Sequence, residues 1–195
     1  MTANNSPLVI TVPGLRGHVD DHWQSRLAVR LPHVHPVPPL GRDNPSLSER
    51  VDALEDAVSR AEQPVVIVAH SAGVLVTVHW ALTPGRDTTP VLGALLATPP
   101  DLASPLPREY PSLAVLGAHG WWPTLLRRLP FPSIVGASAN DTLGEPARVR
   151  AMADAWGSRW HDLGPVGHLN PASGYGDWPA AETFVHELST AKASR

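Results

Sequence analysis

Three residue types in this chain can together perform nucleophilic attack on an acyl group. A serine hydroxyl becomes a good nucleophile only when a base takes its proton. A histidine can act as that base near neutral pH, since the reference pKa of its side chain is about 6.5. A carboxylate on the second ring nitrogen fixes the tautomer and stabilises the imidazolium. Ser71, His168 and Asp141 are the residues that we expect to supply these groups.

Ser71 lies in the segment A-H-S-A-G, residues 69–73, between a strand-like run and a helix-like run. The nucleophile-elbow pattern is G-x-S-x-G at such a strand-to-helix turn. Here the first glycine is replaced by Ala69, which is still small enough for a helix to pass close to the strand. The alternative is that Ser71 only caps the helix, because serine is favoured at that position. We prefer the nucleophile, because an elbow serine also begins a helix.

Acyl transfer also requires N–H groups that stabilise the oxyanion. One donor is expected to be the backbone amide of Ala72, which directly follows the nucleophile. The other is expected in the turn after the first strand, where Gly14 lets the backbone approach the substrate closely. We favour the amide of Leu15, because Pro13 has no N–H.

The elements that must position these residues alternate along the chain. Apolar, β-branched runs predict strands at 8–12, 33–37, 65–69, 91–97, 133–137 and 160–163. Helical spacing and capping signals predict helices at 20–31, 46–62, 73–82, 145–156 and 182–190. This alternation predicts an α/β fold: an open, mostly parallel twisted sheet of about six strands with helices on both faces.

The positions of the candidate residues agree with this architecture. Ligands in such sheets bind beyond the carboxyl ends of the strands. Ser71, Asp141 and His168 each follow a predicted strand, and their order along the chain is the α/β-hydrolase order. Taken individually, Asp141 and His168 are weaker candidates than Ser71. A loop aspartate is often a turn or cap residue, so Asp101 and Glu145 remain rival acids.

The chain contains ten histidines, so the choice of base also has rivals. We interpret eight of the other nine as structural or solvated, and we expect the ninth, His70, to point away from the chemistry. No H-E-x-x-H pattern occurs, and the one H-x-H pair, His33 and His35, has no acid after it. We therefore expect no metal site and no cofactor, and a metal-dependent hydrolase ranks low.

A proline-rich stretch at residues 98–130 lacks a clear periodic pattern and is a candidate lid or pocket lining. Trp121 and Trp122 in this stretch, together with Gly14, are candidate substrate-binding residues. Packing of both tryptophans within the lid is an equal alternative, because tryptophans bury a large apolar area wherever they lie. A pocket narrowed in this way predicts acyl chains of about two to six carbons.

The length, composition and charge of the chain exclude several other classes of protein. A chain of 195 residues with 43% hydrophobic residues can fold as one α/β domain spanning 1–195. The net charge of −3 lacks the excess of positive charge that is typical of proteins that bind nucleic acid. The absence of cysteine excludes disulfides and thiolate catalysis. No apolar stretch approaches the ~20 residues of a membrane span, and the first residues lack a signal-peptide pattern. We expect a cytoplasmic protein that does not bind membranes.

The chain resembles the small serine hydrolases of the YdeN type, which are related to retinoblastoma-binding protein nine. Matching segments lie at 12–14 (V-P-G), 22–24 (H-W-Q), 68–73 (V-A-H-S-A-G), 97–101 (A-T-P-P-D), 129–133 (L-P-F-P-S) and 137–141 (A-S-A-N-D). The most specific match is G-H-x-N-x-x-S-G-x-G-x-W-P at 167–179. The resemblance runs over nearly the whole chain.

This resemblance implies a compact α/β-hydrolase fold with Ser71, Asp141 and His168 as the triad. The family often has two acids where this chain has Asn140 and Asp141, so Asp141 is the only acid candidate there. The partner-binding motif of the mammalian relative contains cysteine, so no such binding is inferred for this chain. We interpret Asn170, Ser173 and Trp178 as ordering the loop that holds the histidine.

The expected function is hydrolysis of a small acyl ester or amide through an acyl-enzyme intermediate. The triad serves both bond types, so the sequence leaves esterase and amidase open. The alternative is a catalytically inactive protein that keeps the fold and acts as an interaction module, because one fold hosts many functions.

Overall fold

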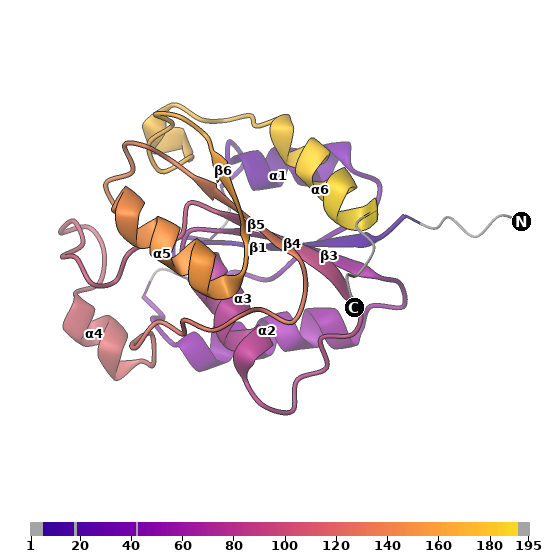
Figure 1. Cartoon of the computed structure of the whole chain (residues 1–195), viewed down its shortest axis with the longest axis horizontal. Helices are drawn as coiled ribbons and strands as arrows, with labels where there is room; N and C mark the ends of the chain where they lie inside the picture. Colours follow the sequence, from indigo (N-terminus) through magenta and orange to yellow (C-terminus); the bar gives the residue numbers. More distant parts are fainter. Residues whose placement is uncertain (1–5, 18, 42, 191–195) are drawn as a thin grey trace, which may run out of the picture.

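A single parallel sheet organises the part of the chain that the computed structural model describes, which is residues 6–17, 19–41 and 43–190. The strand order is β2-β1-β3-β4-β5-β6, and every neighbouring pair is parallel (Figure 1). The strands are β1 (Leu8–Val12), β2 (Val34–Pro36), β3 (Val65–His70), β4 (Val91–Ala97), β5 (Ser133–Ala137) and β6 (Arg159–Asp162). The expected six-stranded α/β architecture is confirmed, and the sheet is wholly parallel within these residues.

Helices pack on both faces of this sheet (Figure 1). They are α1 (Trp23–Arg30), α2 (Leu47–Ser59), α3 (Ala72–Leu82), α4 (Leu113–Ala118), α5 (Pro146–Trp156), the 3₁₀ turn η1 (Pro171–Ser173) and α6 (Ala180–Thr190). Helices α2, α3 and α5 bury their apolar sides in one hydrophobic cluster, and α1 and α6 contribute to a second. These two clusters are the two sides of the sheet.

The central strand β3 shows why the sequence folds in this way. All six of its residues are buried. Successive side chains of a strand point to opposite faces. Ile67 accordingly packs in the cluster on the α3 side, whereas Val66 and Val68 pack in the cluster on the α6 side. A strand covered on both faces favours an unbroken apolar run, which residues 65–69 show.

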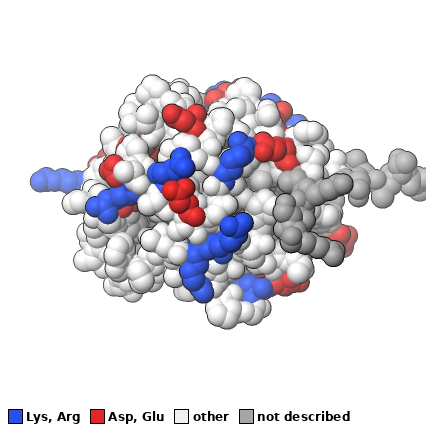
Figure 2. All heavy atoms as spheres, viewed as in Figure 1, with Lys and Arg blue, Asp and Glu red and all other residues white. Residues whose placement is uncertain are grey.

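The predicted elements agree with the observed ones except at their boundaries and in two added elements, helix α4 and the 3₁₀ turn η1. Helix α1 begins at Trp23, because His22 accepts a hydrogen bond from the backbone of Gln24 and acts as its cap. The proline-rich stretch contains the unpredicted helix α4, which Ser112 caps. No helix among the described residues is both long and apolar enough to span a membrane. Basic and acidic side chains are interspersed on the face in Figure 2.

Candidate active site

Ser71 occupies the sharp turn between β3 and α3. Its backbone has φ 56° and ψ −129°, a conformation that L-residues rarely adopt, and its side chain makes no capping hydrogen bond with α3. A Cβ on Gly73 would lie 2.3 Å from the carbonyl oxygen of Val12, so only glycine allows α3 to pass this close to β1. The turn therefore presents the hydroxyl outward from the end of the strand, and the serine does not act as an ordinary helix cap.

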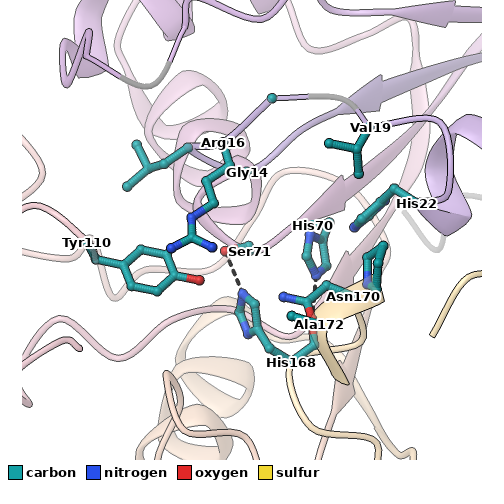
Figure 3. Close-up of a pocket in the computed structure, with 13 residues that line it drawn as sticks. Gly14, Arg16, Val19, His22, His70, Ser71, Tyr110, His168, Asn170 and Ala172 are labelled. Carbon is teal, nitrogen blue, oxygen red and sulfur yellow. Dashed lines mark hydrogen bonds between the residues drawn. The ribbon is translucent and has the colours of Figure 1, made fainter. Parts of the chain in front are cut away.

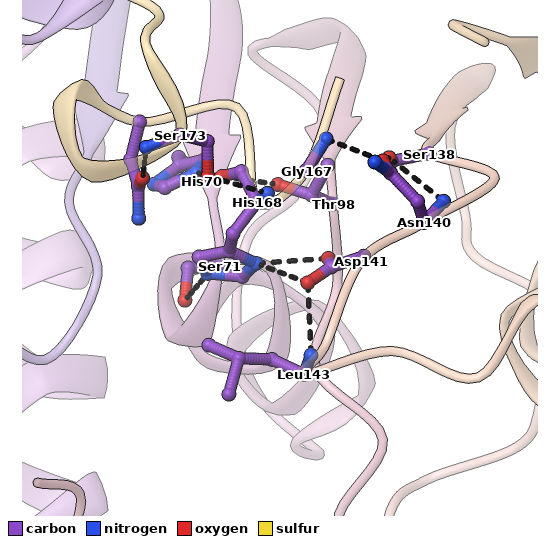
Figure 4. Close-up of polar contacts among 11 residues, drawn as sticks. His70, Ser71, Thr98, Ser138, Asn140, Asp141, Leu143, Gly167, His168 and Ser173 are labelled. Atoms are coloured by element: carbon purple, nitrogen blue, oxygen red, sulfur yellow. Dashed lines mark hydrogen bonds and ion pairs between the residues drawn. The ribbon is translucent and has the colours of Figure 1, made fainter. Parts of the chain in front are cut away.

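A chain of hydrogen bonds links Ser71 to His168 and Asp141 (Figure 4). The distance from His168 Nε2 to Ser71 Oγ is 2.8 Å. His168 Nδ1 lies 2.8 Å from Oδ2 and 3.0 Å from Oδ1 of Asp141. A carboxylate only accepts hydrogen bonds, so Nδ1 carries the ring proton and Nε2 is left to accept the serine proton. The side chains of His168 and Asp141 are 6% and 3% exposed, so the hydrogen bonds between these residues are shielded from bulk water.

Polar side chains tie the loops of the acid and the histidine together. Asn140 Oδ1 accepts a hydrogen bond from the backbone N–H of Gly167 at 2.6 Å. Ser173 Oγ accepts one from the backbone N–H of His168 at 3.0 Å, and Asn170 Oδ1 accepts one from the N–H of Ser173. Asn140 thus connects the loop after β5 to the loop after β6. Asn170 and Ser173 order the histidine loop as expected.

The two rival acids have other partners. Asp101 accepts hydrogen bonds from the backbone of Ala103 and the hydroxyl of Ser104, and it forms an ion pair with Arg148. Glu145 accepts hydrogen bonds from the backbone N–H groups at the start of α5. Of the three acids that the sequence suggested, Asp141 is the one that contacts a histidine.

His70 does not point away from the site, so that expectation was wrong. Its ring lies 5.0 Å from the ring of His168, centroid to centroid, and it lines the cavity in front of Ser71. Its Nε2 is 2.9 Å from the carbonyl oxygen of His168, which can only accept, so Nε2 carries the proton. Burial, assisted by His168 and His22, lowers the pKa of His70 well below its usual value. His70 is therefore a neutral hydrogen-bond donor.

Two hollows meet at Ser71. The first, of about 170 Å³, is open to solvent and is lined by both polar and apolar residues. We call it the polar hollow, because it holds the polar side chains of the site (Figure 3). Its polar side chains belong to Arg16, His22, His70, Tyr110, His168 and Asn170. The second, of about 20 Å³, is enclosed and mainly apolar. Its apolar walls include Leu75, Leu102, Leu106, Leu116, Trp121 and Leu143.

The expected oxyanion donors border these hollows. Leu15 lines both, and Ala72 lines the apolar one. Neither backbone N–H donates a hydrogen bond within the described part of the chain, so both are available to a ligand. Gly14 also lines the polar hollow, and a Cβ there would lie 3.1 Å from Cβ of Ser71. This close approach explains the glycine.

The two candidate tryptophans, Trp121 and Trp122, lie in different places. Trp121 is buried, lines the apolar hollow and donates from Nε1 to the carbonyl of Pro45. Trp122 is 55% exposed and borders a different surface hollow beside α4. The expectation that Trp122 lines the pocket was therefore wrong, because neighbouring side chains of a non-helical segment point in different directions.

Arg16 and Tyr110 are site residues that the sequence did not reveal. Arg16 lies in the turn that supplies Leu15, so its position after a predicted strand was a usable signal. Tyr110 comes from the irregular stretch and had none. Among the described residues, no group of three or more His, Asp or Glu side chains is arranged to hold a metal ion.

Comparisons with known proteins identify the fold and the family of this chain. A solved structure of a YdeN-like hydrolase from Pectobacterium atrosepticum is similar with 27% identity and a TM-score of 0.79, over 94% of this chain and 91% of that chain. The ydeN gene product of B. subtilis shares the fold, with 15% identity and a TM-score of 0.74 over 95% of this chain and 100% of that one.

The fold also matches esterase 2 of Thermogutta terrifontis, with 15% identity and a TM-score of 0.61 over 95% of this chain and 81% of that one. None of the curated proteins compared gives a significant match. The model of the family described as "Serine hydrolase" matches residues 9–187. The chain, with its α/β-hydrolase fold, therefore belongs to the serine hydrolase family.

Proposed function

We propose that this serine hydrolase cleaves a small acyl ester or amide through an acyl-enzyme formed on Ser71. The observation that carries the proposal is the hydrogen-bonded chain from Ser71 Oγ through the His168 ring to the Asp141 carboxylate, with 2.8 Å at each link. Ser71 lines two hollows, which we assign to the two halves of such a substrate.

Each residue has a defined role in this reaction. His168 Nε2 takes the hydroxyl proton as Ser71 Oγ attacks the carbonyl carbon, and Asp141 stabilises the imidazolium that forms. The tetrahedral oxyanion accepts hydrogen bonds from the amides of Leu15 and Ala72. The imidazolium then protonates the leaving group, and a water molecule, activated by His168 in the same way, hydrolyses the acyl-enzyme. Every step uses groups of the chain and water.

The apolar hollow favours short acyl groups. It is lined by leucines and by Trp121, and its free volume is small. A lined cavity of limited size excludes long chains, so we retain acyl groups of about two to six carbons as the preferred substrates.

The direct test is labelling with a fluorophosphonate probe, which reacts with activated serines. Esterase 2 of T. terrifontis was crystallised in a form phosphonylated by cyclosarin. We expect the probe to label wild-type protein on Ser71, with the Ser71→Ala variant unlabelled. The matched control is Ser59→Ala at the end of α2, outside the site, which should label like wild type. An unlabelled wild type that hydrolyses no short ester would favour the alternative, a non-catalytic interaction module.

A further inference from the structure

Arg16 brings a guanidinium to the polar hollow beside Ser71. The residue belongs to the turn after β1, and its side chain extends across the hollow toward Tyr110 (Figure 3). The guanidinium carbon lies 4.4 Å from the centroid of the Tyr110 ring, a cation–π contact. Arg16 Nη2 also donates a long hydrogen bond, 3.5 Å, to the backbone carbonyl of Glu109. These contacts hold the cation in place and leave most of its donors free.

No carboxylate neutralises this cation within the described residues. Ion pairs with acidic side chains are instead formed by Arg26, Arg30, Arg60, Arg86, Arg148, Arg150 and Arg159. The nearby carboxylate of Asp141 accepts hydrogen bonds from His168 Nδ1 and the Leu143 amide and is nearly inaccessible. Arg16 is thus a charged group without a protein counterion at the edge of a ligand-sized hollow.

Tyr110 adds a second donor at the same place. Burial raises the pKa of its hydroxyl, and the neighbouring Arg16 only partly offsets this effect. The phenol therefore stays protonated near neutral pH. A planar guanidinium beside a neutral hydroxyl is a donor set suited to a carboxylate, which guanidinium binds through two parallel hydrogen bonds.

The position of His168 shows which half of a substrate meets Arg16. The leaving group must depart on the side where the imidazolium can protonate it. His168 lines the polar hollow but not the apolar one. The acyl chain therefore enters the apolar hollow, and the alcohol or amine half occupies the polar hollow with Arg16.

We propose that Arg16 and Tyr110 form a carboxylate subsite, so that the natural substrate is a short-chain acyl ester or amide of an alcohol or amine that carries a carboxylate. This inference rests on the proposed function, because the assignment of the two hollows depends on the roles of Ser71 and His168. It adds the chemical class of the leaving group to that function.

The test compares two esters that differ in one charge, 3-(butyryloxy)benzoate and 3-(butyryloxy)benzamide. Each kcat/KM is divided by the rate constant for hydroxide-catalysed hydrolysis of the same ester, which corrects for leaving-group reactivity. We expect wild type to prefer the carboxylate by about tenfold, the size typical of a charge-assisted hydrogen-bonded pair. In Arg16→Gln the ratio should fall to about one, and Arg16→Lys should be intermediate, since it keeps the charge but loses the paired donors.

The matched control is Arg60→Gln at the exposed C-terminal cap of α2, which removes the same charge outside both hollows and should keep the wild-type ratio. A wild-type ratio near one, or an Arg16→Gln variant that keeps the carboxylate preference, overturns the subsite. Labelling of Ser71 by fluorophosphonate without hydrolysis of the carboxylate ester overturns the subsite alone. If wild type is neither labelled nor active on either ester, the proposed function fails and the subsite fails with it.

Discussion

His70 donates a hydrogen bond from Nε2 to the main-chain carbonyl oxygen of His168 at a distance of 2.9 Å. The residue before the nucleophile thus holds the backbone of the residue proposed as its base. This contact joins the end of β3 to the loop after β6, which are far apart in the sequence. The positions of Ser71 and His168 are therefore linked through the buried, neutral side chain of His70.

This contact predicts an acid-sensitive contribution to stability. The pKa of His70 is lowered in the folded state from a reference of 6.5, so the unfolded chain binds its proton more readily. The stabilisation is fully present above about pH 6.5 and is lost as the pH falls below that value. We expect the free energy of unfolding of wild type to fall between pH 7.5 and 5.5, and to fall less in His70→Gln. Urea unfolding at both pH values measures this; equal losses in the two proteins would remove His70 as the cause.

Substitutions at Ser71 separate catalysis from backbone strain. Ser71→Ala should fold normally and lose hydrolysis by about 10⁴-fold or more, because only binding and the oxyanion donors remain. Ser71→Gly should be equally inactive. Ser71 lies just before the first residue of α3, at φ 56°, a conformation that glycine adopts without strain and alanine does not.

We therefore expect Ser71→Gly to be at least as stable as Ser71→Ala in thermal unfolding. A Ser71→Gly variant that is less stable than Ser71→Ala by about 1 kcal/mol, the size of the entropic cost that glycine usually carries, would argue against strain at this turn.

The acid is tested by a pair of aspartates. Asp141→Asn should lower kcat by roughly 10²–10⁴-fold, because an amide cannot stabilise the imidazolium and favours the wrong tautomer. Asp101→Asn is the matched control. It removes a buried carboxylate that holds a turn and pairs with Arg148, so it should cost about 1–3 kcal/mol of stability and leave the activity per folded molecule unchanged. An inactive, well-folded Asp101→Asn with a fully active Asp141→Asn would reverse the assignment.

The sequence predicts those features that depend on local pattern. The strand predicted at 65–69 is identified because both its faces are buried, which requires an unbroken apolar run. Ser71, Asp141 and His168 are found together because each follows a strand of a parallel sheet, and strand ends meet at one edge. Gly73 has the same kind of signal, since its need for close contact with Val12 is part of the elbow pattern.

Features that depend on contacts between distant segments escape this reasoning. Helix α4 has only six residues, too few to show a periodic pattern. The ring of His70 is directed by the carbonyl of His168, and the sequence does not show that contact. Trp122 differs from Trp121 only in the direction of its side chain. The role proposed for Arg16 depends on its contact with Tyr110, which lies in a distant part of the sequence.

Trp121 gives the last prediction, on acyl chain length. It forms a wall of the apolar hollow that borders Ser71, so a smaller side chain should admit longer acyl groups. We expect wild type to hydrolyse esters of about two to six carbons fastest, and Trp121→Phe to raise the ratio of kcat/KM for octanoyl over butyryl esters by several-fold. Trp122→Phe is the matched control; its ring is on the surface beside α4, so the ratio should stay at the wild-type value. A wild-type optimum at twelve carbons or more would contradict the enclosed acyl pocket. If Trp122→Phe raised the ratio as much as Trp121→Phe, Trp122 would also be a substrate-binding residue.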